Sequence, residues 1–180
     1  MKPGWLKVRL PENKDYQYVS DLLLTNKLNT VCIEARCPNR IECWSKKTMT
    51  FMILGNICTR NCRFCAVNTG NPKGEVDKSE PFRIAQIVAK LKLAHVVITS
   101  VTRDDLSDGG ADFFAETIRT IKKSNPQAKV EVLVPDFSGK INAISSATAA
   151  GCDVFSHNIE TVRRLTPIIR DKKANYDLSL

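Results

Sequence analysis

An apolar segment followed by a helical pattern recurs along most of this chain, and this alternation limits the possible folds more than any other feature. The apolar segments, each expected to be a strand, cover residues 48–54, 95–99, 130–134 and 152–155. The segments expected to be helices cover residues 79–91, 110–123, 139–150 and a stretch that runs from 158 to 165. Four strand-then-helix units in succession predict an α/β fold with a parallel sheet and right-handed crossovers.

The carboxyl ends of these predicted strands carry polar residues. They are Thr99, Ser100, Asp136, Ser156, His157 and Asn158. In parallel α/β folds the active site lies at this edge of the sheet. Continuously apolar strands are typical of a sheet that is covered on both faces or closed into a barrel. Because four units cannot close a TIM-type (β/α) barrel, the sheet stays open, another chain supplies the rest, or the sequence is a fragment.

The composition is that of a globular protein. Of the 180 residues, 43% are hydrophobic and 26% are charged, which excludes a disordered or collagen-like chain and predicts one domain, with or without an appendage. No run approaches ~18 apolar residues, and the N-terminus lacks the apolar stretch of a signal peptide. We therefore expect a cytoplasmic protein without a membrane partner. Residues 15–27 are expected to form a short helix.

The formal net charge is +8. A basic surface favours an acidic partner, either a nucleic acid or an acidic protein, and the alternative is a solvated basic face without a specific partner. A cluster of basic residues near the end of the chain presents the same choice between docking an acidic carrier domain and lying on a solvated helix face. This cluster comprises Arg163, Arg164, Arg170, Lys172 and Lys173.

Six of the seven cysteines fall within 34 residues, in two groups of three. The first group is Cys32, Cys37 and Cys43, and the second is Cys58, Cys62 and Cys65. A cytoplasmic chain keeps its cysteines reduced, so this clustering favours metal binding over disulfides. Cys152 stands apart and is expected to be a core thiol.

Each cysteine group supplies three thiolates. A structural zinc ion takes four ligands, so it would have to draw on both groups and leave two cysteines unused. Three thiolates suit a cubane iron–sulfur cluster whose fourth iron is open to another ligand. Backbone N–H groups of the short loops would point at the cluster and offset its negative charge.

The second group resembles the signature of the radical S-adenosylmethionine superfamily. The spacing C-x3-C-x2-C, its place directly after an apolar strand, and Phe64 before the last cysteine carry this resemblance. It implies that S-adenosylmethionine chelates the open iron and that the reduced cluster releases a 5′-deoxyadenosyl radical, which abstracts hydrogen from unactivated carbon. The alternative is a metal-binding loop of another type, or three incidental reduced cysteines.

Within this superfamily the chain resembles the lipoyl synthase family. The resemblance is carried in order by residues 34–44, 55–67, 99–110, 130–137 and 157–161. It implies a sulfurtransferase that inserts two sulfur atoms into an octanoyl chain bound to a lysine of a lipoyl-carrier protein. It also implies an electron donor such as ferredoxin or flavodoxin, and no nucleic acid.

The same resemblance assigns the two cysteine groups to two [4Fe–4S] clusters. The first group would hold an auxiliary cluster that is consumed as the sulfur source, and the second the radical-generating cluster. The chain would divide into an N-terminal auxiliary-cluster segment, residues 1–47, and a partial (β/α) barrel, residues 48–180. Two features depart from the family: Arg40-Ile41 replaces an apolar residue and glycine, and the terminal serine segment that completes the auxiliary cluster has no match.

Six residues are candidates for cofactor binding: Phe64, Thr99, Ser100, Arg103, Asn158 and Glu160. Loop capping is the alternative for those that follow the strand at 95–99. No catalytic side chain is expected beyond the cluster ligands. His157 is expected to be a structural histidine, and Asp104, Asp105 and Asp108 are expected to cap the following helix.

Two other functions remain open at this point. One is a different two-cluster radical enzyme, such as a tRNA methylthiotransferase, which would use the basic charge to bind RNA. The other is a non-catalytic iron–sulfur or zinc-binding module. The number and kind of bound metal ions would separate them.

Overall fold

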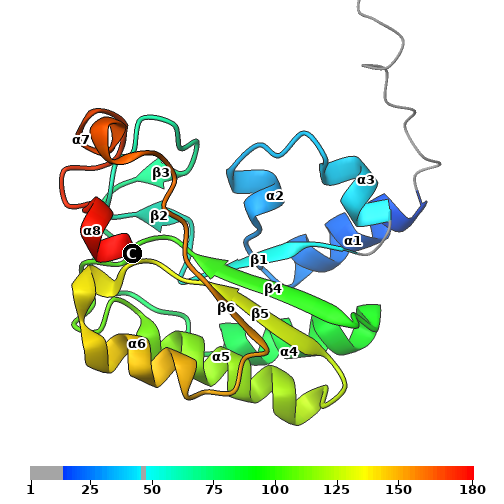
Figure 1. Ribbon diagram of the computed structural model, residues 1–180. Coiled ribbons are helices and arrows are strands. Elements are labelled where there is room, and N and C mark those ends of the chain that lie inside the picture. The colour runs from blue at the N-terminus through cyan, green and yellow to red at the C-terminus, as the bar shows by residue number, and fades with distance from the viewer. Residues whose placement is uncertain (1–13, 46–47) are drawn as a thin grey trace, which may run out of the picture.

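The fold is described by a computed structural model that covers residues 14–45 and 48–180 (Figure 1). Residues 1–13 and 46–47 lie outside the described part. The prediction about a signal peptide concerns these first residues, and part of the predicted segment 1–47 also lies among the residues that are not described. None of the described helices combines the length and the apolar character that crossing a bilayer requires.

A sheet of four parallel strands lies at the centre of the fold, in the spatial order β1-β4-β5-β6. The strands are β1 (Thr50–Ile53), β4 (His95–Ser100), β5 (Lys129–Leu133) and β6 (Val154–Ser156). The chain adds one strand after another in the same direction, as in the wall of a barrel. This confirms the predicted α/β fold with four strand units, and within the described residues the barrel is not closed.

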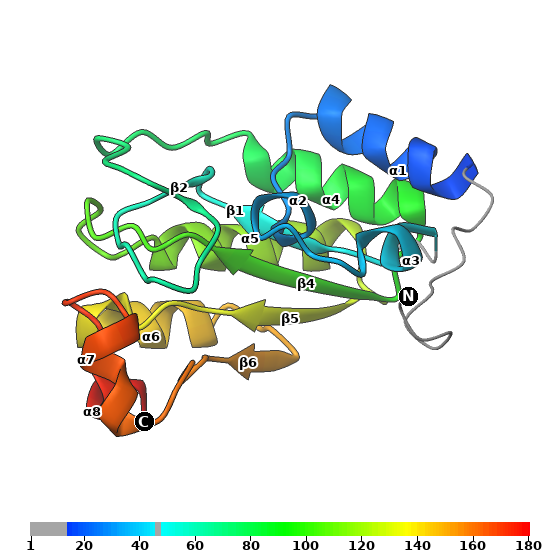
Figure 2. The ribbon, with the colours of Figure 1, turned by 90° about the horizontal axis from the view of Figure 1, so that it is seen from above.

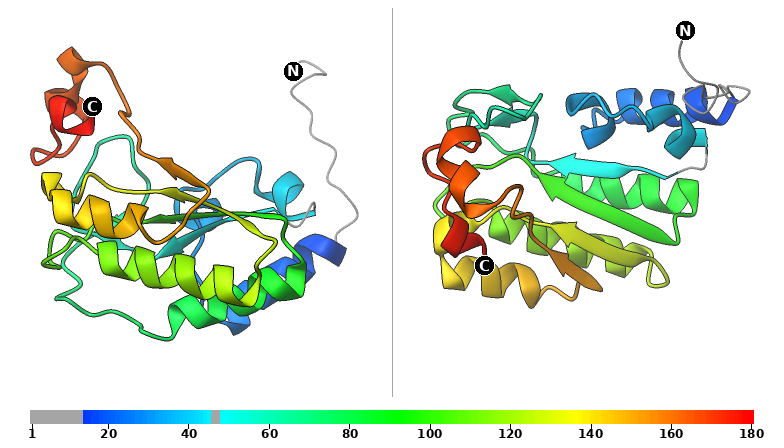
Figure 3. Two further views of the ribbon diagram at one scale, coloured as in Figure 1. Left: turned by 60° about the horizontal axis from the view of Figure 1, so that its bottom comes forward. Right: turned by 45° about the horizontal axis from the view of Figure 1, so that its top comes forward.

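Three helices cover one face of this sheet. α4 (Glu80–Leu91), α5 (Ala111–Ser124) and α6 (Ile141–Thr148) lie side by side beneath it (Figures 1 and 3). Alternate strand residues are fully buried, among them Val96, Ile98, Val130 and Val132. The residues between them, such as Val97 and Leu133, are partly exposed. Because successive strand residues face opposite sides, one face of the sheet is packed and the other is only half covered.

A helical segment precedes β1 and lies along its outer edge (Figure 2). It contains α1 (Lys14–Thr25), α2 (Val31–Glu34) and α3 (Arg40–Ser45). Thr30 forms an antiparallel bridge with Phe51, and the N–H of Met52 donates to the Asn29 carbonyl at 2.9 Å. α1 confirms the expected helix, and these contacts fasten the segment that bears the first cysteine group to the sheet.

Trp44 anchors α3. Its side chain is 1% exposed, it stacks on Tyr16 with a centroid distance of 5.2 Å, and the Arg40 guanidinium lies 5.7 Å from its ring. Burial of a tryptophan removes a large apolar area from water. The two short helices of the first cysteine group were not predicted, because neither is long enough to show a helical period.

The expectation of a helix from 158 to 165 is wrong at its start. The chain after β6 is irregular, and Glu160 has φ +66°. A 3₁₀ turn, η3 (Arg163–Leu165), then leads into α7 (Thr166–Ile169), where Pro167 occupies the first turn. Proline is favoured there because it lacks the N–H that a first turn leaves unpaired. A last short helix, α8 (Tyr176–Ser179), ends the described chain.

Gly110 fixes the entry to α5 and gives a test of the packing. Its φ is +91°, and an added Cβ would lie 2.3 Å from Cδ1 of the buried Leu54. We expect Gly110→Ala to lower the free energy of unfolding by about 2 kcal/mol, from backbone strain and overpacking together. Urea unfolding measures this change.

Gly151→Ala is the matched control, because Gly151 has φ +90° with open space around the Cβ position. It should cost about 1 kcal/mol from backbone strain alone. Equal losses in the two variants would show that the contact with Leu54 constrains nothing.

Candidate functional site

A cavity of about 180 Å³ lies at the carboxyl ends of the strands, the edge of the sheet at which the sequence predicts the active site. All three cysteines of the second group line it. Five of the six predicted cofactor contacts also line it, namely Phe64, Thr99, Ser100, Asn158 and Glu160. Segments far apart in the sequence therefore meet in one place, because parallel strands present their carboxyl ends at the same edge.

Arg103, the sixth predicted contact, does not line this cavity. Its side chain is 1% exposed and donates to the carbonyls of Leu54, at 3.0 Å, and Glu75, at 2.9 Å. It also pairs with the carboxylate of Asp105 at 2.8 Å. The guanidinium thus ties two loops together at the end of β1, and its donors are used within the protein.

The second cysteine loop begins at a tight turn after β1. Leu54 and Gly55 both have positive φ, at +68° and +86°, which redirects the chain away from the sheet. The short strand β2 (Ile57–Cys58) then pairs in parallel with β3 (Asn68–Thr69). Cys58 therefore lies on paired backbone, although so short a pair gave no pattern from which to predict it.

Two backbone N–H groups point at cysteine sulfurs. The N–H of Arg60 donates to Cys58 Sγ at 3.4 Å, and that of Asp171 donates to Cys62 Sγ at 3.2 Å. Burial raises the pKa of the Cys62 thiol, and the Asp171 N–H and the charge of Arg170 oppose that rise. A metal ion that binds Cys62 must therefore displace a proton. N–H groups directed at sulfur are typical of loops that hold iron–sulfur clusters.

Three polar atoms that line the cavity are buried and have no partner among the described residues: Ser100 Oγ, His157 Nε2 and Arg170 Nε. His157 Nδ1 lies 2.8 Å from the Val134 carbonyl. A carbonyl only accepts, so Nδ1 carries the proton and the Nε2 of a neutral ring is left as an acceptor. Buried polar atoms are normally paired, so these three indicate a cavity that takes a polar ligand.

Thr99 and Phe64 contribute differently. The Thr99 hydroxyl donates to the Leu133 carbonyl at 2.8 Å, so its proton is committed to the sheet edge. Phe64 is 50% exposed and lies at the cavity beside Cys65. These two residues therefore offer mainly apolar surface to a ligand.

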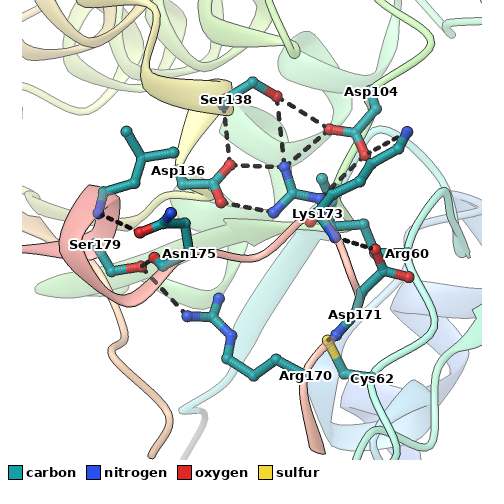
Figure 4. Close-up of polar contacts among 12 residues, drawn as sticks. Arg60, Cys62, Asp104, Asp136, Ser138, Arg170, Asp171, Lys173, Asn175 and Ser179 are labelled. Carbon is teal, nitrogen blue, oxygen red and sulfur yellow. Dashed lines mark hydrogen bonds and ion pairs between the residues drawn. The ribbon is translucent and has the colours of Figure 1, made fainter. Parts of the chain in front are cut away.

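Arg60, between Cys58 and Cys62, is the centre of a buried charge network that sequence reasoning missed (Figure 4). Its guanidinium donates twice to Asp136, at 2.6 and 2.8 Å, and twice to Asp104, at 3.0 and 2.9 Å. Arg60 and Asp136 are each 6% exposed. Such bidentate, charge-assisted pairs fix geometry strongly.

The network also sets the ionisation of its members. Burial opposes the charges, yet hydrogen bonds from Arg60 lower the pKa of Asp136 and hold that of Asp104 at about 2. The same contacts raise the pKa of Arg60 above its usual value. The three groups remain charged at neutral pH, so the second cysteine loop is held to the ends of β4 and β5 by ion pairs.

The three aspartates that were predicted to cap the following helix make different contacts in the structure. Asp108 accepts from the N–H groups of Gly110, at 2.9 Å, and Asp112, at 2.8 Å, which confirms its capping role. The capping role was wrong for Asp104 and Asp105, which instead pair with Arg60 and Arg103.

The predicted basic cluster is not one solvated face. Arg170 turns toward the cavity, Lys173 binds Asp104 at 3.3 Å, and Arg163 pairs with Asp177. Arg164 and Lys172 are exposed. The inward contacts require the chain to return to the second cysteine loop, which local sequence does not reveal.

The first cysteine group lies apart from this cavity. Cys32 is buried in the hydrophobic core at 8% exposure, and Cys37 and Cys43 are partly exposed. Cys152 is partly buried, packs against the core, and has its pKa raised by burial. No disulfide joins any of the seven cysteines, all of which lie in the described ranges.

The donor chemistry of the two groups can be compared. In residues 14–45 and 48–180, no three His, Cys, Asp or Glu side chains converge as ligands of a single ion would. In a cubane cluster each thiolate binds a different iron atom, so the thiols do not have to converge on one point to hold a cluster. The second group fits one, with a shared cavity, N–H groups on sulfur and unpaired polar atoms beside it. The first group offers three thiols that do not line this cavity.

Comparison with known proteins extends this description. Residues 52–180 match the family model described as the Radical SAM superfamily. The chain is 56% identical over 179 residues to the lipoyl synthase of Caldicellulosiruptor saccharolyticus, covering 99% of this chain and 62% of that protein. It is 52% identical over 178 residues to the lipoyl synthase of Pyrobaculum calidifontis, covering 99% and 61%. The chain thus spans about three-fifths of the length of these curated relatives.

Proposed function

Because the chain belongs to the radical SAM superfamily, we propose that it provides the cluster-bearing part of a lipoyl synthase. Its substrate would be an octanoyl chain bound to a lysine of a lipoyl-carrier protein, and a donor such as ferredoxin or flavodoxin would supply electrons. The observation that carries the proposal is the cavity shared by the second cysteine group and the strand-end residues. When bound, a [4Fe–4S] cluster with S-adenosylmethionine supplies a radical that abstracts hydrogen, and a second cluster supplies sulfur.

Different residues of the cavity would bind the cluster and S-adenosylmethionine. Cys58, Cys62 and Cys65 would hold one cluster and leave an iron open toward the cavity. Arg170 Nε and Ser100 Oγ are unpaired donors suited to a carboxylate, while His157 Nε2 is suited to accept from an amino or hydroxyl group. S-adenosylmethionine carries all three kinds of group.

Asn158 and Glu160 follow β6 and face the same cavity. Their amide and carboxylate would bind the ribose hydroxyls or the amino group of S-adenosylmethionine, because these groups donate hydrogen bonds. Arg103 is left out of the proposed binding set, since its donors already bind carbonyls of the protein.

The first cysteine group would hold the auxiliary cluster. Its three thiols lie on a segment fastened to β1, and the similarity to lipoyl synthases extends over 99% of this chain and so includes that segment. On this proposal the chain divides into an auxiliary-cluster segment, residues 1–47, and a partial barrel, residues 48–180. The sulfur transferred to the octanoyl chain would come from the cluster held by the first of these.

Anaerobic reconstitution with iron and sulfide tests the proposal. We expect about eight iron atoms per chain in the parent protein and about four in Cys58→Ala, because each cubane holds four. Cys152→Ala is the matched control and should keep all eight, since Cys152 belongs to neither group. Zinc in place of iron, or an iron content unaffected by Cys58→Ala, would contradict the proposal.

A further inference from the structure

The second cysteine loop is bound by residues that lie more than 100 positions further along the chain. The N–H of Asn61 donates to Asp171 Oδ2 at 2.9 Å, and the N–H of Asp171 donates to Cys62 Sγ at 3.2 Å. The N–H of Arg63 donates to the Ile169 carbonyl at 2.8 Å. Three consecutive residues of the loop are therefore each contacted by the segment 169–173, which begins at Ile169, the last residue of α7.

That segment is itself fixed at two places (Figure 4). Arg170 donates to the Ile159 carbonyl at 3.4 Å and to Ser179 Oγ at 3.2 Å, which ties it to the chain after β6 and to α8. Lys173 Nζ lies 3.3 Å from Asp104 Oδ2, which ties it to the loop after β4. The Arg170 contacts thus hold the segment independently of the cysteine loop, whereas Asp104 binds both Lys173 and Arg60 of that loop.

We infer that residues 169–173 form a strap that fixes the second cysteine loop for cluster binding, with Asp171 as its positioning residue. The inference rests on the proposed function, in which this loop holds a [4Fe–4S] cluster. Asp171 acts in two ways. Its carboxylate holds the Asn61 N–H, and its own N–H is directed at the sulfur of Cys62.

The two contacts have separable physical consequences. The carboxylate restricts the backbone beside Cys62, so the thiols need less ordering when iron binds. A hydrogen bond to a thiolate sulfur stabilises the more negative, reduced form of a cluster and so raises its reduction potential. Loss of the carboxylate should therefore loosen the loop in the iron-free chain, and loss of the N–H should lower the potential of the cluster in the loaded one.

Amide hydrogen exchange in the iron-free chain tests the strap without any cluster. In Asp171→Ala we expect the amides of Asn61 and Arg63 to exchange roughly tenfold faster than in the parent chain. Asp171→Asn keeps one acceptor oxygen and should restore part of the protection. Asp177→Ala is the control, because Asp177 of α8 pairs with Arg163 of η3 and forms no hydrogen bond with the cysteine loop within the described residues.

The loaded protein gives the second readout. The reduction potential is measured by electron paramagnetic resonance for the signal that disappears in Cys58→Ala. Alanine at position 171 keeps the backbone N–H, so Asp171→Pro, which lacks both the carboxylate and the N–H, is compared with Asp171→Ala, which lacks the carboxylate alone. We expect the potential to be lower in Asp171→Pro than in Asp171→Ala, and unchanged from the parent in Asp177→Ala. If iron content depends on Cys58 but exchange is the same in Asp171→Ala as in the parent, or the potential is the same in Asp171→Pro as in Asp171→Ala, the inference about residues 169–173 is wrong and the proposed function is unaffected. If iron content does not depend on Cys58, the proposed function is wrong, and the inference that residues 169–173 fix this loop for cluster binding is wrong as well.

Discussion

Replacing Arg60 with methionine is expected to lower the free energy of unfolding by about 3–5 kcal/mol, the range for breaking a buried ion pair by removing one partner. Methionine fills much of the same volume but leaves Asp136 without its ion partner at 6% exposure. The Asp104 carboxylate, at 10% side-chain exposure, keeps Lys173 as an ion partner and the hydrogen bond from the Ser138 hydroxyl. Urea unfolding of the iron-free chain measures the change without any contribution from a cluster.

Arg83→Met is the matched control for this prediction. Arg83 pairs with Asp77 at 2.8 Å, but the Asp77 side chain is 56% exposed. Exposed pairs of this kind contribute about 0–1 kcal/mol. Adding Asp136→Asn to Arg60→Met should recover part of the loss, because it removes the unpaired buried charge. A loss in Arg60→Met no larger than in Arg83→Met would show that the network does not stabilise the fold.

Stability is expected to fall as pH rises from 4.5 to about 7, and Glu80 is expected to cause most of that fall. Burial raises the pKa of Glu80 from 4.5 to about 7, and the carboxylate accepts one hydrogen bond, from the Leu54 N–H at 2.9 Å. In this pH window the folded chain holds a proton that the unfolded chain has released. The stabilisation is therefore complete at low pH and is lost as pH rises through about 7.

Glu80→Gln isolates this effect, because glutamine remains neutral and keeps an acceptor for Leu54. We expect the two proteins to agree within about 1 kcal/mol at pH 5, and the variant to be more stable by about 3 kcal/mol at pH 8. Their difference cancels the titrations they share. Asp77 and Asp104, with pKa values of about 2, lose their contribution only at lower pH.

Glu116→Gln, on the exposed side of α5, is the control and should leave the pH dependence unchanged. A parallel pH profile for Glu80→Gln and the parent chain would mean that Glu80 ionises in the fold without cost. The pH range 5–8 is accessible to urea unfolding monitored by circular dichroism.

The strands and helices of the partial barrel were predictable because their signals are local. An apolar run such as 95–99, or an amphipathic stretch such as 110–123, carries its structure in its own residues. The polar strand ends could then be placed together, because parallel strands align their carboxyl ends. This is why five of the six predicted contact residues line the same cavity.

The contacts that organise the site were not predictable in this way. Arg60 finds its partners 44 and 76 residues away, and Arg170 lies in a stretch whose composition is that of a solvated surface. His157 was expected to be satisfied, but only one of its ring nitrogens has a partner among the described residues. No local signal separates Arg60, which is buried, from Arg63, which lies between the next two cysteines and is exposed.

The second cysteine loop is completed by the last part of the described chain, and this has a consequence for biosynthesis. Asn61 and Cys62 are bound by Asp171, 110 and 109 residues later. At translation rates of about 5–20 residues per second, the cysteines are made roughly 5–20 s before the residue that fixes them. Nascent chains arrested before residue 169 should therefore show unprotected Asn61 amides, and protection there would contradict this order of events. Iron and sulfide that reach this loop before Asp171 has been made would meet a chain in which these two contacts have not yet formed.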